Sequence, residues 1–330
     1  GFEHNMFNYG ATPDMVYSDM NSYGWSLLTQ HYYMMYWGAL ALVLAVFSYA
    51  MWQRGPDTNL ANRLKIIGYS LGPKGQFAVV LGTVLFISVG TLIHYNTRVI
   101  NSFETRDEQL QLQVDYEQSF KAFEDDPIPT ITAVNLEAAI FPKLRKLEAI
   151  SNISVYNNTS SVIKRVLINY PRNSSVAIDG ANISDYNPRL KTAWLTFKTP
   201  LNPQERSEIS VRLSRQHFGF KDKDEDASLV KNGTFINNVD LFPYFGVNRN
   251  FYVNDPHQRR KYNLPVLQRA YLLEDESKYS QSNLGANVGY IDFKAKLATS
   301  EEQIALAPGK LLNYWSEGSR NYFVYESDAP

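Results

Sequence analysis

The sequence contains no cysteine and only five histidines among its 330 residues. The absence of cysteine excludes disulfides, thiolate metal sites and a thiol nucleophile. The histidines are scattered, and no His-Glu-x-x-His segment could place two imidazoles on one helix face to bind zinc. We therefore expect this chain to hold no cofactor and no catalytic or metal-ligating residue of its own.

Two further absences narrow the class of function. A phosphate-binding P-loop is missing, because Gly309-Lys310 lacks the required upstream glycine and is followed by Leu311 instead of a hydroxyl residue. An excess of positive charge is missing too: the net charge is −1, which gives no electrostatic basis for binding nucleic acid. We expect no nucleic-acid partner.

Long uncharged apolar runs occur only near the start of the chain, at residues 32–52 and 75–94. Each run is about 20 residues long, the length with which a helix crosses roughly 30 Å of hydrocarbon. Tyrosines and tryptophans border the first run, and these side chains favour the membrane interface. The pattern predicts two transmembrane helices and a lipid bilayer as a partner.

Lysine and arginine are absent from the first 31 positions, whereas the loop 53–74 between the two runs is basic. It contains Arg54, Arg63, Lys65 and Lys74. Basic loops stay on the cytoplasmic side of a membrane. The sequence therefore predicts a cytoplasmic loop, with residues 1–31 and the large C-terminal part on the opposite side.

The chain after the second run is first helical in pattern and then strand-like. A helical linker is expected over residues 95–128, since Leu112, Tyr116 and Phe120 share one helix face over 102–125. Alternation with period two then recurs at 131–140, 147–156, 162–168, 193–197, 209–213, 288–297 and 322–325, with a loop or short helix over 255–279. The expected fold is a membrane α-helical hairpin followed by a mainly-β extracytoplasmic domain, a saddle or sandwich, over residues 129–330.

Two short motifs have a functional and a structural interpretation. Gly68-Tyr-Ser70-Leu-Gly72 matches a nucleophile elbow, but the strand that should precede it is missing, so we interpret it as the entry into the second apolar run. Asp222, Asp224 and Asp226 alternate as in a calcium loop. An EF-hand also needs a glycine and a glutamate that are missing here, which favours a solvated charged loop.

Several segments, in order along the chain, are similar to one known family. They are Phe2-Glu-His4, Gly10-Ala-Thr-Pro13, Tyr95-Asn-Thr97, Asp115-Tyr-Glu117, Asn232-Gly-Thr-Phe-Ile-Asn-Asn-Val-Asp240 and Asp255-Pro-His-Gln-Arg-Arg-Lys-Tyr-Asn-Leu-Pro265. On these segments the chain resembles a bacterial family in which an ABC transporter permease is fused to an aminopeptidase of the aminopeptidase N type, a zinc metallopeptidase. The resemblance implies that 1–31 is a periplasmic segment, that 32–52 and 75–94 are the last two permease helices, and that 129–330 is the N-terminal β domain of the peptidase.

The resemblance further implies a hydrolase that removes N-terminal residues from peptides with zinc-activated water. The zinc and the catalytic domain are expected outside this chain, which begins at Gly1 without an initiator methionine and is expected to be part of a longer protein. In relatives a Gln-x-Glu pair binds the free amine of the substrate, and Asn238 and Asp240 occupy the matching positions. Both can accept hydrogen bonds from an ammonium group; the alternative is that they form a turn between strands.

The location implied by the resemblance is the bacterial inner membrane, with the large domain in the periplasm. The implied partners are the remaining permease helices and the catalytic domain of the same protein, a separate ABC ATPase subunit and a peptide substrate. Two other functions stay open. One is a permease subunit of an exporter whose outer domain handles cargo, and the other is a non-catalytic structural domain of a membrane complex.

Overall fold

The computed structural model describes residues 3–15, 17–19, 22–24, 26–52, 71–171, 173–223, 226–237, 240–267, 274 and 290–327. The chain divides into two compact units. Unit 1 consists of Gly1–Thr105 and Phe218–Ala227, and unit 2 consists of Arg106–His217 and Ser228–Pro330. A short segment from the second half of the chain therefore belongs to the first unit. Most of the predicted basic loop lies outside the described residues.

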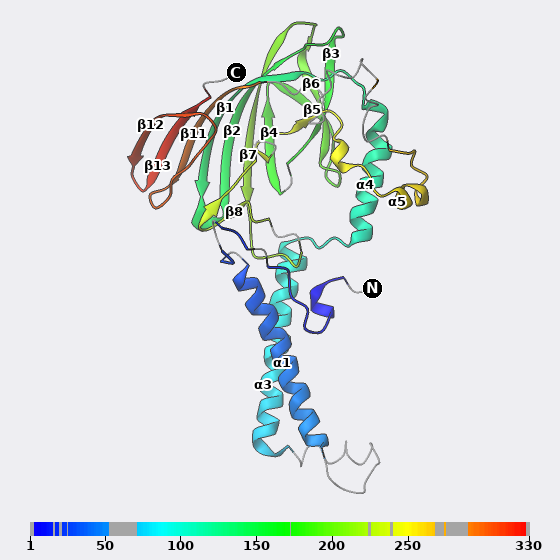
Figure 1. The fold of residues 1–330 in the computed structure, drawn as a ribbon, viewed down its shortest axis with the longest axis vertical. Helices are drawn as coiled ribbons and strands as arrows, with labels where there is room; N and C mark the ends of the chain where they lie inside the picture. Colours follow the sequence, from blue (N-terminus) through cyan, green and yellow to red (C-terminus); the bar gives the residue numbers. More distant parts are fainter. Residues whose placement is uncertain are drawn as a thin grey trace. The chain divides into compact units, whose positions relative to one another are not determined.

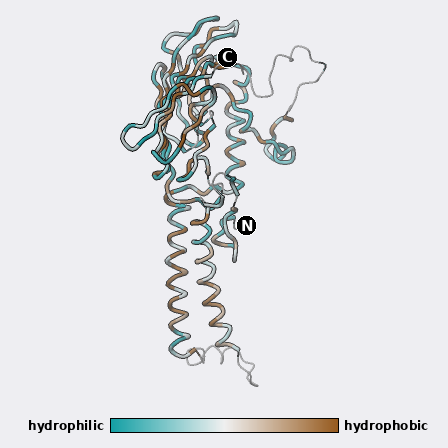
Figure 2. The backbone as a smooth tube through the Cα atoms, turned by 60° about the vertical axis from the view of Figure 1, so that its left-hand side comes forward, coloured by the Kyte–Doolittle hydropathy of each residue, from teal (hydrophilic) through white to brown (hydrophobic). Residues whose placement is uncertain are grey.

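Unit 1 is built on two long helices that lie side by side, α1 (Leu27–Met51) and α3 (Gly72–His94) (Figure 1). The helix α3 continues directly into a π-helical turn, Tyr95–Ile100. Both helices are long and apolar enough to cross a membrane, by length and composition, and Figure 2 shows hydrophobic residues along most of their length. The two predicted long apolar helices are confirmed, although α1 begins at Leu27 and not at residue 32.

Small and aromatic residues hold α1 and α3 together. A Cβ added at Gly82 of α3 would lie 2.7 Å from Val43 Cγ2, so a larger residue would push the helices apart. Near the start of α1 the two helices share a cluster of buried aromatic and aliphatic side chains. Its members are Tyr33, Tyr36, Trp37, Val89, Ile93 and Phe220. On the outer surfaces, apolar side chains such as Phe77 and Ile87 are exposed, as is expected of helices that face lipid.

Two other segments of unit 1 pack on one end of the helix pair. The N-terminal segment is attached there because Trp37 Nε1 donates a hydrogen bond to Ala11 O at 2.7 Å. The segment 218–223 lies at the same end, where Phe220 stacks on Tyr32 with ring centroids 5.5 Å apart. Residues from three distant parts of the sequence thus meet where α1 begins and α3 ends.

Unit 2 begins with a helix and continues as a mainly-β domain, which confirms that part of the expected fold. The helix α4 (Arg106–Phe120) is followed by a 3-10 turn (Lys121–Phe123), and a short helix α5 (Pro256–Lys261) comes later. The strands are β1 (Thr130–Phe141), β2 (Lys146–Tyr156), β3 (Ile163–Asn169), β4 (Ser174–Asp179), β5 (Ala181–Asn187), β6 (Thr192–Leu201), β7 (Arg206–Gln216), β8 (Leu229–Val230), β9 (Gly233–Thr234), β10 (Tyr244–Phe245), β11 (Asp292–Ser300), β12 (Lys310–Glu317) and β13 (Arg320–Glu326).

These strands form a seven-stranded sheet in the order β12-β13-β11-β1-β2-β7-β4 and a four-stranded sheet in the order β10-β3-β6-β5. The large sheet is mixed, because β1 pairs in parallel with β11 and antiparallel with β2. The two sheets share one hydrophobic core, to which the large sheet contributes Val134 and Leu147 and the small sheet Ile168 and Leu195. The domain is therefore a two-layer β structure.

The period-two pattern explains the central strands. Along β2, Leu147, Ile153 and Val155 are buried, whereas Glu148 and Asn152 between them are exposed. Successive side chains of a strand point to opposite faces, so this alternation buries one face against the second sheet and leaves the other in water. The helix predicted over 102–125 is shorter in the structure, ending at Phe120.

Candidate functional site

The two predicted amine-binding residues come after β9 in the sequence. Asn238 lies outside the described residues, so its role stays a prediction. Asp240 is described, and its backbone N–H donates a hydrogen bond to Asn237 O at 2.9 Å. A hydrogen bond between residues three apart closes a tight turn. This bond fits the turn interpretation of Asp240, and the amine-binding role of its side chain stays a prediction.

The Asp240 side chain is held by Arg215 of β7. Arg215 is 2 % exposed, and its Nη2 donates to Asp240 O at 3.1 Å and lies 3.5 Å from Asp240 Oδ1. The Asp240 side chain itself is 34 % exposed. The guanidinium group thus orients the backbone and the carboxylate together, while part of the carboxylate stays accessible.

Sequence reasoning missed Arg215, although a signal exists. Ile209, Val211 and Leu213 alternate inward along β7, and Arg215 continues that buried phase. A charged residue at an inward position requires a partner, because an unpaired buried charge is costly. Asp240 can therefore serve as an acceptor for a cationic ligand or as the structural partner of a buried arginine, and the distances fit both roles.

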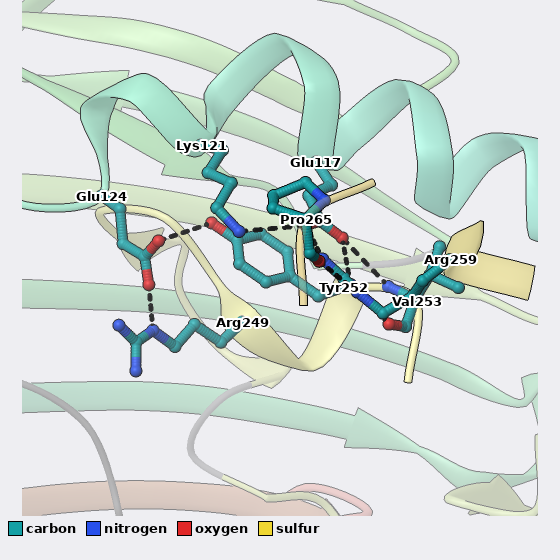
Figure 3. A network of polar contacts seen from close by, with 8 residues as sticks. All are labelled: Glu117, Lys121, Glu124, Arg249, Tyr252, Val253, Arg259 and Pro265. Carbon is teal, nitrogen blue, oxygen red and sulfur yellow. Dashed lines mark hydrogen bonds and ion pairs between the residues drawn. The ribbon is translucent and has the colours of Figure 1, made fainter. Parts of the chain in front are cut away.

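A second polar network joins α4 to α5 (Figure 3). Glu117, which has no exposed surface, accepts hydrogen bonds from Arg259 Nη1 at 2.8 Å and from Arg259 Nη2 at 2.6 Å. Arg259 also donates to Val253 O and Pro265 O. Burial pushes the pKa of Glu117 up, but the hydrogen bonds and charges of Arg259 and Lys121 outweigh it and hold the pKa below its ordinary value.

This network occupies two of the segments on which the family resemblance rests, those that end at Glu117 and at Pro265. Between Asp115 and Glu117, Tyr116 is also engaged: its hydroxyl donates to Asn169 Oδ1 at 2.7 Å and accepts from the N–H of Asn248 at 2.9 Å. Burial raises the pKa of Tyr116 to about 12. The hydrogen bonds of these side chains go to other groups within unit 2, so the side chains stabilise the fold of this unit.

Unit 1 contains a buried polar cluster around Asp222. Asp222 Oδ1 accepts a hydrogen bond from Tyr33 Oη at 2.5 Å and lies 3.3 Å from His4 Nδ1. Asp222 Oδ2 accepts from the N–H of Asn5 at 3.2 Å, and His4 Nε2 lies 3.0 Å from Thr97 Oγ1. The solvated loop expected here is wrong at Asp222, whose side chain is 0 % exposed. The apolar surroundings of α1 and α3 explain this, since a charge among them must be paired.

The order Asp222, His4, Thr97 resembles the acid, imidazole and hydroxyl of nucleophilic enzymes. Thr97 is 1 % exposed, however, and its Oγ1 donates to Ile93 O at 2.9 Å. A nucleophile must reach a substrate and give its proton to the imidazole. Thr97 meets neither condition, so this cluster is not a catalytic triad.

In the described ranges of the chain, no group of three or more His, Asp or Glu residues could hold a metal ion. The described residues therefore do not fit the zinc that the family resemblance implies for the longer protein. Ser70 of the elbow-like motif and Asp224 of the calcium-like motif lie outside those ranges.

No family model and no curated protein matches the sequence. Solved structures that are similar to it include an M1 zinc metallopeptidase from Deinococcus radiodurans, with 12% identity over 60% of this chain and 38% of that one and a TM-score of 0.35. A two-domain M1 zinc metallopeptidase bound to L-tryptophan has 11% identity, coverages of 63% and 41%, and a TM-score of 0.37. Legionella pneumophila aminopeptidase A in complex with aspartic acid has 13% identity, coverages of 63% and 21%, and a TM-score of 0.31.

The similarity spans about two fifths of the length of the M1 zinc metallopeptidases and about one fifth of the Legionella enzyme. At these identities and TM-scores it carries no argument about activity. The function has to be argued from the residues of this chain.

Proposed function

We propose that this chain is the membrane-anchored part of an aminopeptidase-like protein of the zinc metallopeptidase class. In this proposal α1 and α3 are the last two helices of an ABC-type permease, and unit 2 contains the N-terminal β domain of the peptidase. The observation that carries the proposal is Asp240, an accessible carboxylate that a buried arginine holds in one orientation. The ordered segments of the family resemblance support it, as do two long apolar helices ahead of a mainly-β domain.

Asp240 is proposed to bind the free amine of a peptide substrate together with Asn238. The substrate ammonium group would donate to the exposed part of the Asp240 carboxylate, and a charge-assisted hydrogen bond of this kind is among the stronger ones. The zinc and the bond-breaking residues would come from the catalytic domain of the same longer protein. Association with a separate ABC ATPase subunit remains a prediction from the resemblance.

The proposed location is the bacterial inner membrane, with the β domain in the periplasm. A chain that crosses the membrane twice returns to the side from which it started. In agreement with this, the N-terminal segment, which precedes both helices, and the segment 218–223, which follows them, contact the same end of the helix pair. The basic loop 53–74 favours the cytoplasm for the other end. Protease added to intact spheroplasts should cut the chain after Arg98 and spare the loop, whereas protection of the β domain would contradict this orientation.

The amine-binding role is tested in the full-length protein with two substrates. Replacing Asp240 by alanine should weaken transition-state binding of a peptide with a free N-terminus by about 2–4 kcal/mol, as is typical when a charged pair loses one partner. The same peptide with an acetylated N-terminus has no ammonium group and should be unaffected. Asp179→Ala is the matched control, because Asp179 also pairs with an arginine of β7, Arg212, but both are more than half exposed.

A second candidate, a non-catalytic structural domain, is favoured by the hydrogen bonds that tie Asp240 to Asn237 and Arg215. In that case Asp240→Ala should lower the thermal stability of the protein, and any loss of activity should be equal for the free and the acetylated peptide. The two candidates therefore predict different values for one ratio: the loss of kcat/KM with the free peptide divided by the loss with the acetylated peptide.

A further inference from the structure

In the cluster around Asp222 in unit 1, the hydrogen bonds determine which nitrogen of His4 carries a proton. The hydroxyl of Thr97 has one proton, which it donates to Ile93 O at 2.9 Å. The hydrogen bond between His4 and Thr97 must therefore use a proton on His4 Nε2, with Nε2 and Oγ1 at 3.0 Å. In the neutral ring His4 Nδ1 is then unprotonated, and it accepts from the N–H of Met6 at 3.1 Å.

This arrangement leaves two acceptors facing each other. His4 Nδ1 lies 3.3 Å from Asp222 Oδ1, and neither atom carries a proton when the imidazole is neutral and the carboxylate ionised. A proton added to Nδ1 would bond to Asp222 Oδ1, but it would also turn Nδ1 into a donor that faces the Met6 N–H. His4 thus has two mutually exclusive bonding patterns, one for each charge state.

The charged and titratable groups around His4 come from every packed element. Arg98 and His94 belong to α3 and its π-helical extension, Lys223 follows Asp222, and Tyr33 comes from α1. On the N-terminal segment itself, the Glu3 carboxylate lies 3.9 Å from Lys223 Nζ.

Burial is the main factor that lowers the pKa of His4. The charge of Asp222 opposes this effect by raising the pKa, and the neighbouring Arg98, His94 and Lys223 lower it further. The folded cluster therefore prefers neutral His4.

We propose that His4 and Asp222 form a proton-operated latch that holds the N-terminal segment on the helix pair when His4 is neutral and releases it when His4 is protonated. The ligand of this site is a proton from solvent, which binds His4 Nδ1. Protonation removes the acceptor that caps the 3-10 turn Asn5–Phe7. It also brings a new donor to a carboxylate that already accepts from Tyr33 and Asn5.

Release would not require the two helices to separate. Beyond the latch the segment is held by hydrogen bonds, such as Tyr36 Oη to Met6 O at 3.3 Å and Trp37 Nε1 to Ala11 O at 2.7 Å. Met6 also packs against the cluster of α1 and α3, and the Tyr9 ring contacts the Trp37 ring, and none of these contacts depends on the charge of His4. The cluster of Tyr33, Val89 and Ile93 between α1 and α3 is apolar or neutral and contains no imidazole. The proposal thus limits the change to the N-terminal segment, and it does not depend on the proposed peptidase function.

The test is hydrogen exchange on the full chain in lipid nanodiscs, following the backbone amide of Met6. Exchange is compared at about pH 8 and about pH 5, on either side of the ordinary histidine range, after correction for the intrinsic pH dependence of exchange. We expect the protection of this amide to fall at least about tenfold at the lower pH, as local opening requires. An unchanged protection factor would overturn the proposal.

Variants assign the effect to His4. His4→Asn keeps an acceptor near the Met6 N–H but cannot titrate, so its protection should be the same at both pH values. His31→Asn is the control, because His31 Nδ1 lies 2.6 Å from Leu27 O of its own helix, and His31 is not part of the Asp222 cluster. This variant should keep the wild-type response. A response that persists in His4→Asn would overturn the proposal.

Tyr33→Phe tests the role of Asp222 independently, through the direction in which the midpoint pH of release shifts. Loss of the Tyr33 hydroxyl leaves Asp222 with one donor fewer, so protonated His4 becomes the replacement donor. This pairing stabilises the latched state with His4 protonated, so the midpoint of release should move to lower pH in this variant. A shift to higher pH, or no shift, would show that the Asp222 carboxylate does not control the latch.

Discussion

The ion pair between Glu117 and Arg259 allows a prediction whose sign and size both follow from the geometry (Figure 3). Arg259→Ala removes the two guanidinium hydrogen bonds to Glu117. The carboxylate keeps only the N–H of Val253 at 3.4 Å and Lys121 Nζ at 3.3 Å, and the Lys121 side chain is 34 % exposed. A buried charge that loses its main partner typically costs about 3–5 kcal/mol. We expect a loss of that size in the free energy of unfolding.

The pH dependence of stability should change direction in this variant. In the wild-type chain the pKa of Glu117 lies below its ordinary value of 4.5. The pair therefore contributes stability above that value, and the contribution is lost as the pH falls through the folded pKa. Without Arg259, burial becomes the dominant influence and raises the pKa of Glu117. The variant should then gain stability relative to the wild type as the pH falls from about 7 to about 4.

The assay is urea unfolding of the full chain in detergent, followed by tryptophan fluorescence. Trp194 contributes to this signal from unit 2, where it packs edge-on against Phe123. The double variant Glu117→Leu with Arg259→Leu is the matched control. It removes both charges, and replacing a buried ion pair by apolar residues is often nearly neutral. The reasoning is refuted if Arg259→Ala costs less than about 1 kcal/mol, or if the double variant is as unstable as the single one.

Two further variants and one metal assay test other parts of the description. Gly82→Leu should destabilise the helix pair by about 1–3 kcal/mol, because the added side chain overlaps Val43. Thermal unfolding in detergent would measure this loss of stability. The control position is Gly38, where an added Cβ would meet nothing within 4 Å. Asn157→Ala should lower the free energy of unfolding by about 2–3 kcal/mol in a urea titration. The buried Asn157 amide donates hydrogen bonds to Ser161 O and Leu201 O and accepts one from Thr159. The control Asn152→Ala, at an exposed site, should leave the free energy of unfolding nearly unchanged. The dialysed chain should carry no stoichiometric zinc by elemental analysis, and one zinc per chain would reveal a ligand set that the sequence conceals.

The central strands and both apolar helices could be predicted from the sequence because burial leaves a periodic pattern. The strands that the sequence did not predict are β4, β5, β8, β9, β10 and β12, and each of them pairs with a neighbouring strand on one side only. An edge strand has a neighbour on one side only, and β12 is exposed along nearly its whole length. Its side chains therefore need no alternation, and the period-two signal is missing. Local pattern could not find these strands, whereas it found β1 and β2 to within one residue at each end and the middle of β7.

The polar sites were harder to predict for a different reason. Glu117 and Arg259 are 142 residues apart in the sequence, and Tyr33 and Asp222 are 189 apart. No spacing rule connects such partners, and each residue taken alone has a common surface interpretation. Arg215 was missed as well, although its position in the inward-facing phase of β7 is a signal of burial. Asp240 was identified only through the family resemblance, which implied an amine-binding role for it. The resemblance did not indicate that Arg215 pairs with Asp240.

The assignment of residues 218–227 to the helix unit has a consequence for the order in which the protein is made. Tyr33 sits near the start of α1, yet its partner Asp222 is synthesised 189 residues later. At about 5–20 residues per second, the ribosome needs roughly 10–40 s to bridge that interval. Throughout that time the end of the helix pair lacks the carboxylate that Tyr33, His4 and Asn5 bind in the finished protein. Biogenesis of the helix pair therefore ends only after most of the strands of the β domain have left the ribosome.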